Sequence, residues 1–157
     1  MIKQITIVFL VIYSCSSISL NRSYKKHNYI EQPVFLFQRT ACYGTCPQYK
    51  ISIYSDGLVM YDGVRFVDRI GCYSGFLNNQ SYLDMKSMIL NSIFFSLNKE
   101  YNSPITDVPS VILDVNINNI HQHKVIDRLS GPKELKAIHN YIDSIIQTVD
   151  VWEQCPD

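Results

Sequence analysis

The chain has 157 residues, 46% of them hydrophobic, and its 14 basic and 14 acidic side chains give a formal net charge of +0. This balance argues against a nucleic-acid partner, because counterion release requires a basic face. The length fits a single domain with a real core once a targeting segment is removed, so disulfides are not needed simply to fold it.

The first 14 residues resemble the leader of an exported lipoprotein. Lys3 precedes an apolar run from Ile5 to Tyr13, which is shorter than the ~20 residues that cross a bilayer. Ser14 and Cys15 end the run as in a bacterial lipobox, whose cysteine is lipidated and becomes the first residue of the mature chain. We therefore expect a signal peptide over residues 1–14 and a lipid anchor on Cys15 that holds the protein to a membrane.

A polar segment separates this leader from the folded part of the chain. Residues 15–32 show no periodicity, which predicts a flexible tether before a single α+β domain over residues 33–157. Ser16 stands where an Asp would suggest inner-membrane retention, so the pattern predicts an outer-membrane protein of the cell envelope that faces the periplasm. The alternative is an ordinary cleaved signal or an uncleaved anchor, with Cys15 incidental.

Apolar and alternating runs predict an antiparallel meander at the start of the domain. Asp56-Gly57 and Asp62-Gly63 each predict a tight turn, because a type I′ turn favours positive φ at both central residues. The segment from Gly71 to Phe76 is expected to be a break. Four strands are predicted around these turns: Val34–Phe37, Tyr49–Tyr54, Leu58–Tyr61 and Val64–Ile70.

Two helices and a second hairpin complete the predicted domain. Asn78 suits the cap of a helix from Asn79 to about Asn91, and Pro132 suits the first turn of a second helix. Alternation predicts strands over Val111–Ile117 and Ile120–Asp127 between them. The predicted fold is α+β in the order ββββ-α-ββ-α, with an antiparallel sheet (a β-meander plus a second hairpin) and two helices packed on one face.

The densest chemical cluster lies between the first two predicted strands. Cys42 and Cys46 flank Gly44, and Cys72 and Cys155 follow later in the chain. Disulfides persist in exported domains, so a structural Cys42–Cys46 bridge is the first interpretation, although four cysteines allow three pairings. A redox dithiol or a copper site is the alternative, because soft thiolates select Cu(I) and Cys-x-x-x-Cys-Pro resembles the copper motif of Sco-type assembly proteins.

Other polar residues carry weaker patterns. His121 and His123 share a strand face, but no carboxylate or cysteine lies at ligand spacing, so a solvated face is favoured and no metal or cofactor is predicted. The sequence lacks Gly-x-Ser-x-Gly, His-Glu-x-x-His and a phosphate-binding glycine loop, so no catalytic residue is predicted. Arg39 is expected to pair with Asp107 and to hold the Tyr101–Pro109 loop against the cysteine loop.

A longer pattern surrounds the cysteines: Arg39-x-x-Cys42-x-Gly44-x-Cys46-Pro47-x-Tyr49, then Asp56-Gly57, then Phe66-Val67 with Gly71. It continues with Phe94-Phe95-x-Leu97, Tyr101, Thr106-Asp107-x-Pro109 and Pro132-x-x-Leu135. The pattern resembles the bacterial domain of unknown function family 6438 over Val34 to Trp152. The resemblance implies secretion, often as a lipoprotein, and implies no activity.

These features together predict a non-catalytic binding domain of an envelope lipoprotein. Its expected partners are the membrane, through the lipid anchor, and a protein or envelope ligand that the sequence does not identify. Loops on rigid scaffolds commonly carry binding, so the expected surface includes Arg39, Tyr43 and Asp107. The alternative is a thiol-redox or copper-binding protein that uses Cys42 and Cys46, and a hydrolase would instead require a pocket with convergent polar groups.

Overall fold

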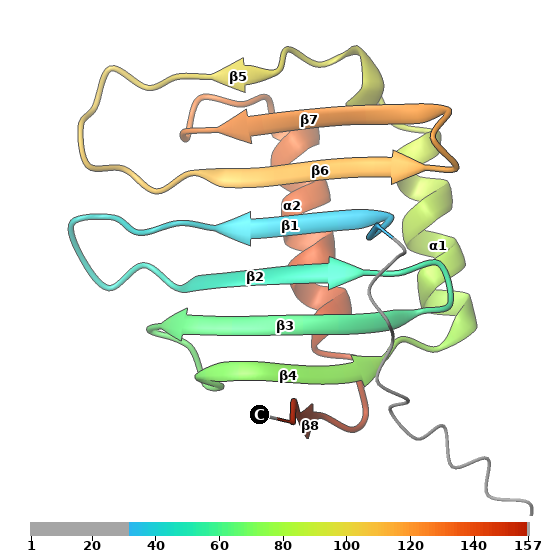
Figure 1. The fold of residues 1–157 in the computed structure, drawn as a ribbon. Coiled ribbons are helices and arrows are strands. Elements are labelled where there is room, and N and C mark those ends of the chain that lie inside the picture. The colour runs from blue at the N-terminus through green and yellow to red at the C-terminus, as the bar shows by residue number, and fades with distance from the viewer. Residues whose placement is uncertain (1–31, 157) are drawn as a thin grey trace, which may run out of the picture.

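An eight-stranded sheet runs through residues 32–156, which are the residues that the computed structural model of the protein describes. The sheet order is β5-β7-β6-β1-β2-β3-β4-β8, and the two helices lie on the same side of the sheet (Figure 1). The predicted leader over residues 1–14, the lipidation site Cys15 and nearly all of the predicted tether fall outside the described residues.

The elements follow one another along the chain in an order that differs from the predicted one. They are β1 (Phe35–Arg39), β2 (Gln48–Ile53), β3 (Leu58–Arg65), β4 (Gly71–Phe76), α1 (Asn79–Leu90), the 3-10 turn η1 (Phe94–Ser96), β5 (Glu100–Tyr101), β6 (Val111–Ile117), β7 (His121–Asp127), α2 (Lys133–Ile146) and β8 (Glu153–Gln154). The sheet is mixed, because β5 pairs with β7 in parallel. The predicted antiparallel sheet in the order ββββ-α-ββ-α is therefore wrong.

The two strands that the prediction lacks are the short edge strands. β5 and β8 have two residues each, so neither is long enough to show the alternation that marks a strand in a sequence. β5 is held to β7 where the Lys99 and Tyr101 carbonyls accept hydrogen bonds from the amides of Ile126 and Arg128, at 2.9 and 2.8 Å. Short edges of this kind limit pairing with other chains.

The prediction is also wrong around Gly63, where the Asp-Gly pair suggested a turn. Gly63 lies inside β3, opposite Tyr49 on β2 and Gly71 on β4, so Asp62-Gly63 is not a turn. A Cβ at Gly63 would overlap the carbonyl oxygen of Arg69, so the β3–β4 loop requires a glycine there for close approach. The predicted strand Val64–Ile70 is mostly this loop, and the predicted break over residues 71–76 is β4.

The first Asp-Gly pair does connect two strands. The Gly57 amide donates to the Tyr54 carbonyl at 3.1 Å, and the Asp56 carboxylate accepts from the Leu58 amide at 3.0 Å. Only Gly57 has a positive φ, of 84°, whereas the predicted turn type requires a positive φ at both central residues.

The core lies between the sheet and the two helices. The cap prediction is confirmed, because the Asn78 side chain accepts a hydrogen bond from the Ser81 amide at 2.8 Å at the start of α1. α2 turns a buried stripe toward the sheet, made of Leu135, Ile138, Ile142, Ile145 and Ile146. Full burial of one such side chain contributes roughly 1.5–3 kcal/mol. Within residues 32–156, no helix has both the length and the apolarity that a bilayer crossing requires.

The longer connections gather at one end of the sheet. The β1–β2, β3–β4 and β5–β6 loops and the connection from β7 to α2 all lie at this end, which we call the loop end (Figure 1). The β2–β3 and β6–β7 hairpins lie at the opposite end (Figure 1). The loop end therefore brings together four segments that are distant in sequence.

Candidate functional site

The four cysteines of the described residues form two disulfides. Cys42 is joined to Cys46 with 5.8 Å between their Cα atoms, which closes a small loop after β1. Cys72 is joined to Cys155 with a Cα separation of 5.4 Å, and the Cys155 amide also donates to the Cys72 carbonyl at 3.0 Å. The second bridge fixes β8 to β4, and neither pair retains a thiolate in this state.

The cysteine loop lies against the β5–β6 loop. The Tyr43 amide donates to the Asp107 carbonyl at 3.1 Å, and the Thr40 amide donates to the Ser110 carbonyl at 3.0 Å. The Ser110 amide returns a 2.8 Å bond to the Thr40 hydroxyl. Tyr43 and Asp107 are therefore brought together, through the backbone. The expected ion pair between Arg39 and Asp107 is wrong, because the Arg39 side chain points toward α2 and pairs with Asp143.

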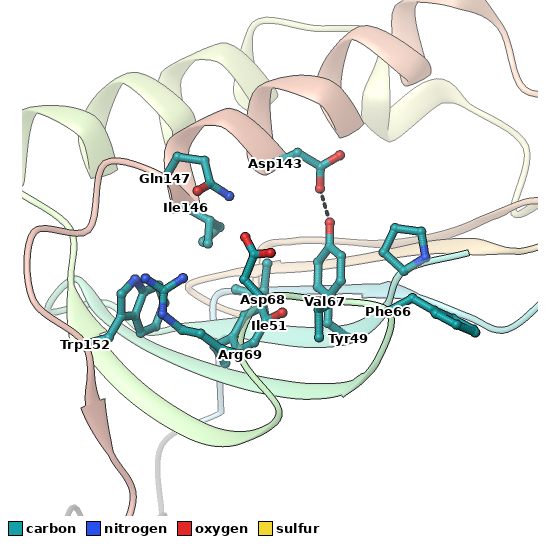
Figure 2. A pocket seen from close by; sticks show the side chains of 12 residues that line it. Tyr49, Ile51, Phe66, Val67, Asp68, Arg69, Asp143, Ile146, Gln147 and Trp152 are labelled. Carbon is teal, nitrogen blue, oxygen red and sulfur yellow. Dashed lines mark hydrogen bonds between the residues drawn. The ribbon is translucent and has the colours of Figure 1, made fainter. Parts of the chain in front are cut away.

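A pocket of about 230 Å³ opens under the β3–β4 loop (Figure 2). β2 and β3 form its floor, the end of α2 forms its roof, and the segment after α2 closes one side. Aromatic rings and polar side chains line it together: Pro47, Tyr49, Ile51, Tyr61, Phe66, Val67, Asp68, Arg69, Asp143, Ile146, Gln147 and Trp152.

The aromatic rings of this pocket contact one another. Tyr49 and Tyr61 stack with ring centroids 5.6 Å apart, and Tyr61 meets Trp152 edge-on at 5.7 Å. The Arg69 guanidinium lies 5.5 Å above the indole of Trp152, and Figure 2 shows the two side by side at the pocket's edge. These contacts hold the pocket walls in place without any ligand.

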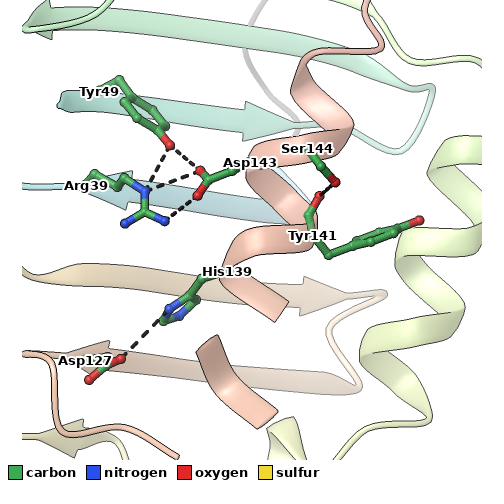
Figure 3. A network of polar contacts seen from close by, with 7 residues as sticks. All are labelled: Arg39, Tyr49, Asp127, His139, Tyr141, Asp143 and Ser144. Atoms are coloured by element: carbon green, nitrogen blue, oxygen red, sulfur yellow. Dashed lines mark hydrogen bonds and ion pairs between the residues drawn. The ribbon is translucent and has the colours of Figure 1, made fainter. Parts of the chain in front are cut away.

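A three-residue polar network links the middle of the sheet to α2 (Figure 3). Arg39 and Tyr49 face each other across β1 and β2, and Asp143 reaches them from the helix. The Arg39 guanidinium pairs with both carboxylate oxygens of Asp143, and its Nε donates to the Tyr49 hydroxyl at 3.1 Å. The Tyr49 hydroxyl in turn donates to Asp143. Every polar group of the network therefore has a partner.

The protonation states of this network follow from its geometry. Burial alone would lower the pKa of Arg39, but the hydrogen bond and charge of Asp143 outweigh it and raise that pKa. Burial, followed by the hydrogen bond and charge of Asp143, raises the pKa of Tyr49. Tyr49 therefore stays a neutral hydroxyl that donates, and it is not an activated base.

A second polar pair lies deeper under the same helix. His139 and Asp127 are each 3% exposed, and His139 Nδ1 is 3.9 Å from the nearer Asp127 oxygen (Figure 3). Asp127 accepts a 2.7 Å bond from the Gly131 amide. Among the described residues, His139 Nε2 is buried without a hydrogen-bond partner. Burial lowers the pKa of His139 to about 4, although the charge of Asp127 opposes the shift.

The other two histidines of the domain pack against aromatic rings. His123 lies 5.4 Å from the ring of Phe94, and its Nε2 is 2.9 Å from the Leu97 carbonyl. His121 lies 5.4 Å from the ring of Phe95. The predicted solvated face is therefore wrong for His123, which is half-buried. Over residues 32–156, no group of three His, Cys, Asp or Glu side chains could hold a metal ion.

Residues 33–146 match the family model described as Domain of unknown function (DUF6438). The chain belongs to this family. The matched segment starts just before β1 and ends at the last residue of α2, so the cysteine loop, the Arg39 network and the Asp127–His139 pair all lie within the DUF6438 domain. A search of curated proteins found no match.

Sequence reasoning missed Asp143 and His139 of the DUF6438 domain, and Trp152 beyond the matched segment, as site residues. Asp143 and His139 are four residues apart on α2, so they share a helix face beside the apolar stripe. Two polar residues bordering a buried stripe are a signal that could have been found. Trp152 lies outside the matched segment and has no periodic context, so its place in the pocket depends on the fold alone.

Proposed function

We propose that this DUF6438 domain is a non-catalytic binding domain that recognises a partner protein with its loop end. The observation that carries the proposal is Tyr43, whose side chain is 94% exposed at the tip of the disulfide-closed loop. An aromatic side chain held out from a rigid scaffold is typical of the anchors that dominate binding energy.

The support around Tyr43 is rigid before any partner binds. The Cys42–Cys46 bridge restricts the loop, and the amide of Tyr43 is fixed to the Asp107 carbonyl. The two bonds between Thr40 and Ser110 join the bases of the same loops. A loop that is already ordered loses little conformational entropy on association, so more of its contact energy contributes to affinity.

Further apolar side chains are exposed on the other segments of the loop end. Ile105, on the neighbouring β5–β6 loop, is 63% exposed. The β3–β4 loop and the connection from β7 to α2 add more at the same end: Phe66, Ile70 and Leu129. Apolar groups that gather on one end of a monomer mark an interaction site, and the exposed Asp107 and Thr106 supply polar contacts at its edge.

The remaining chemistry of the domain favours binding over the alternatives. Copper binding needs thiolates, and the two disulfides leave none at the four cysteines of the described residues. The Asp127–His139 pair is buried, so it offers no base to a substrate in solvent. The carboxylate of Asp143 is already bonded to Arg39 and Tyr49.

We also propose that Cys15 carries a lipid and that residues 15–32 tether the domain to the outer membrane, facing the periplasm. The run that ends at Ser14-Cys15 supports this, and two disulfides suit an oxidising compartment. Replacement of Cys15 by Ala should move the mature protein from the membrane fraction to the soluble fraction. An unchanged membrane fraction, or an unmodified cysteine by mass spectrometry, would refute the anchor.

The loop-end proposal is tested by crosslinking and then by affinity. A photo-crosslinking residue at position 43 of the full chain should capture one discrete protein in the producing cell. The same residue at position 120 is the control, because Ile120 is 77% exposed on the β6–β7 hairpin at the opposite end. With the purified partner, Tyr43→Ala should weaken binding roughly 30-fold, whereas Ile120→Ala should leave it unchanged.

Two results would contradict the proposal. Equal crosslinking from both positions, or equal affinity of the two alanine variants, would remove the loop end as the binding surface. Free thiols at Cys42 and Cys46 in the native protein, or stoichiometric uptake of Cu(I), would instead support the thiol-redox or copper-binding alternative.

A further inference from the structure

We propose that the pocket under the β3–β4 loop binds a single uncharged sugar ring, at a site that does not include Tyr43. The pocket residues lie on β2, β3, the β3–β4 loop, α2 and the segment after α2, and neither Tyr43 nor Ile105 lines it, although Phe66 belongs to both surfaces. The proposal therefore does not depend on the partner protein. It uses the aromatic walls, the unpaired polar groups and the balance of charge in this pocket.

The size and rigidity of the pocket set the first limit on the ligand. Its volume of about 230 Å³ is below the ~300–1,000 Å³ of pockets that enclose drug-sized molecules, so it accepts about one substituted ring. The wall formed by Trp152 is fixed from two sides, because Tyr61 contacts its ring and the Cys72–Cys155 bridge holds the strand that follows it. Gly75 permits this close packing, since a Cβ there would overlap Val149.

Apart from Arg69, whose guanidinium lies over Trp152, the polar side chains that line the pocket fall into two sets. Asp143 is saturated by Arg39 and Tyr49 and has little capacity left for a ligand. By contrast, over residues 32–156 the Asp68 carboxylate, the Gln147 side-chain amide and the Tyr61 hydroxyl have no hydrogen-bond or ion-pair partner. The unpaired set contains a carboxylate that accepts, a hydroxyl that does both, and an amide that does both.

The charges around the pocket cancel. Asp143 is matched by Arg39, and Asp68 is adjacent in sequence to Arg69, whose guanidinium lies over Trp152. A cationic ligand would be attracted by Asp68 but repelled by Arg69. An anionic ligand would be attracted by Arg69 but repelled by Asp68. The site therefore favours an uncharged ligand whose groups both donate and accept hydrogen bonds, which is the property of hydroxyl groups.

The aromatic rings of the pocket indicate that the ligand's hydroxyl groups are attached to a scaffold with an apolar face. Tyr61 and Trp152 line the pocket with aromatic surface, together with the unpaired polar groups. Figure 2 shows the Trp152 indole, the Asp68 carboxylate and the Gln147 amide around the same pocket. A sugar ring matches this arrangement, because its C–H groups cover one face and its hydroxyls project around the rim. A free monosaccharide and the terminal unit of a glycan both have such a ring, so both fit the pocket.

The intrinsic fluorescence of Trp152 provides the test, because it is the only tryptophan of the chain. The full chain is titrated with glucose, galactose and N-acetylglucosamine, and then with oligosaccharides that end in the same units. Glucosamine and glucuronate serve as charged comparators. We expect a saturable change with at least one uncharged sugar and weaker responses to both charged ones. Tighter binding of an oligosaccharide than of its terminal unit would identify a glycan as the ligand, and equal binding would identify the free sugar.

Two matched variants separate the pocket from the opposite face of the sheet. Asp68→Ala should weaken sugar binding about tenfold, because a hydrogen bond to a charged acceptor is lost. Asp62→Ala should change nothing, since Asp62 is an exposed carboxylate that follows Tyr61 on β3 and faces the opposite side of the sheet. Both side chains are exposed, so both variants should fold.

Several outcomes would overturn the proposal. These are no saturable response to any uncharged sugar, equal losses in the two variants, or a response confined to glucosamine or to glucuronate. Tyr43→Ala should leave sugar binding unchanged, so failure of the sugar site and failure of the loop surface are distinguishable.

Discussion

Two polar side chains of α2 face the sheet, and they differ in how well their hydrogen bonds are satisfied. Asp143 is half-buried and meets Arg39 and Tyr49, so the guanidinium, the hydroxyl and the carboxylate each have a partner. His139, one turn earlier, is buried 3.9 Å from Asp127. Among the described residues its Nε2 has no partner at all.

The difference shows how partial exposure and hydrogen bonding together decide which groups keep a charge. Where Asp143 reaches solvent and two donors, the ion pair survives and the pKa of Arg39 rises. Where His139 is enclosed, the charges of Asp127 and Asp143 do not offset the loss of water, and the pKa of the imidazole falls. One pair holds α2 in place by attraction, and the other makes the fold sensitive to acid.

The largest expected effect is therefore a loss of stability in acid that depends on His139. Its pKa is about 4 in the folded protein and about 6.5 when unfolded, so the unfolded chain binds more protons between these values. The contribution is fully present above pH 6.5 and is lost as the pH falls toward 4, by about 3 kcal/mol in total. Arg39 and Lys136 add to the lowered pKa, and Asp143 and Asp127 oppose it.

Urea unfolding at a series of pH values measures this effect. His139→Phe should unfold with a flatter pH profile, because no buried imidazole remains to be protonated. Parallel profiles for wild type and His139→Phe between pH 4 and 6.5 would show that other groups govern the acid sensitivity.

The second effect is the cost of breaking the satisfied network. Asp143→Ala leaves the Arg39 guanidinium and the Tyr49 hydroxyl without their acceptor, and we expect a loss of about 2 kcal/mol. This is less than the ~3–5 kcal/mol for a fully buried pair, because the two side chains are 25% and 30% exposed. The midpoint of urea unfolding at pH 7 measures it.

A carboxylate outside the network provides the control for that measurement. Asp150 is exposed just beyond α2, and Asp150→Ala should change the free energy of unfolding by less than about 0.5 kcal/mol. If Asp143→Ala is no more destabilising than Asp150→Ala, then the network contributes nothing to the docking of α2.

Periodicity located the elements that are long enough to carry it. The alternation over Val111–Ile117 coincides with β6, and the apolar stripe that begins at Leu135 lies on α2. It did not locate β5 or β8, whose two residues pair only because the fold brings them to a sheet edge. At Asp62-Gly63 a strong local turn preference lost to three-strand pairing, because the β3–β4 loop needs the space that glycine leaves.

The site was harder to predict than the strands, because its partners are distant in sequence. Arg39 is an isolated cation beside the cysteines, and Asp107 is an acid that no turn pair explains, so the sequence suggested pairing them. The structure joins Arg39 to Asp143, 104 residues away, and no pattern in a single sequence encodes that contact. The alternation places Tyr49 on a strand face. Only the structure shows that its hydroxyl accepts a hydrogen bond from Arg39, the residue that pairs with Asp143.

The smallest expected effect isolates that hydroxyl from the rest of the network. Tyr49→Phe keeps the ring that stacks on Tyr61 and leaves the Arg39–Asp143 pair intact, so only the two hydrogen bonds of the hydroxyl are lost. We expect a loss of about 1 kcal/mol in urea unfolding, since each hydrogen bond exchanged with water contributes little. The matched control is Tyr141→Phe, because within residues 32–156 the Tyr141 hydroxyl has no hydrogen-bond partner. A loss for Tyr49→Phe as large as that for Asp143→Ala would mean that the hydroxyl, and not the ion pair, holds the network together.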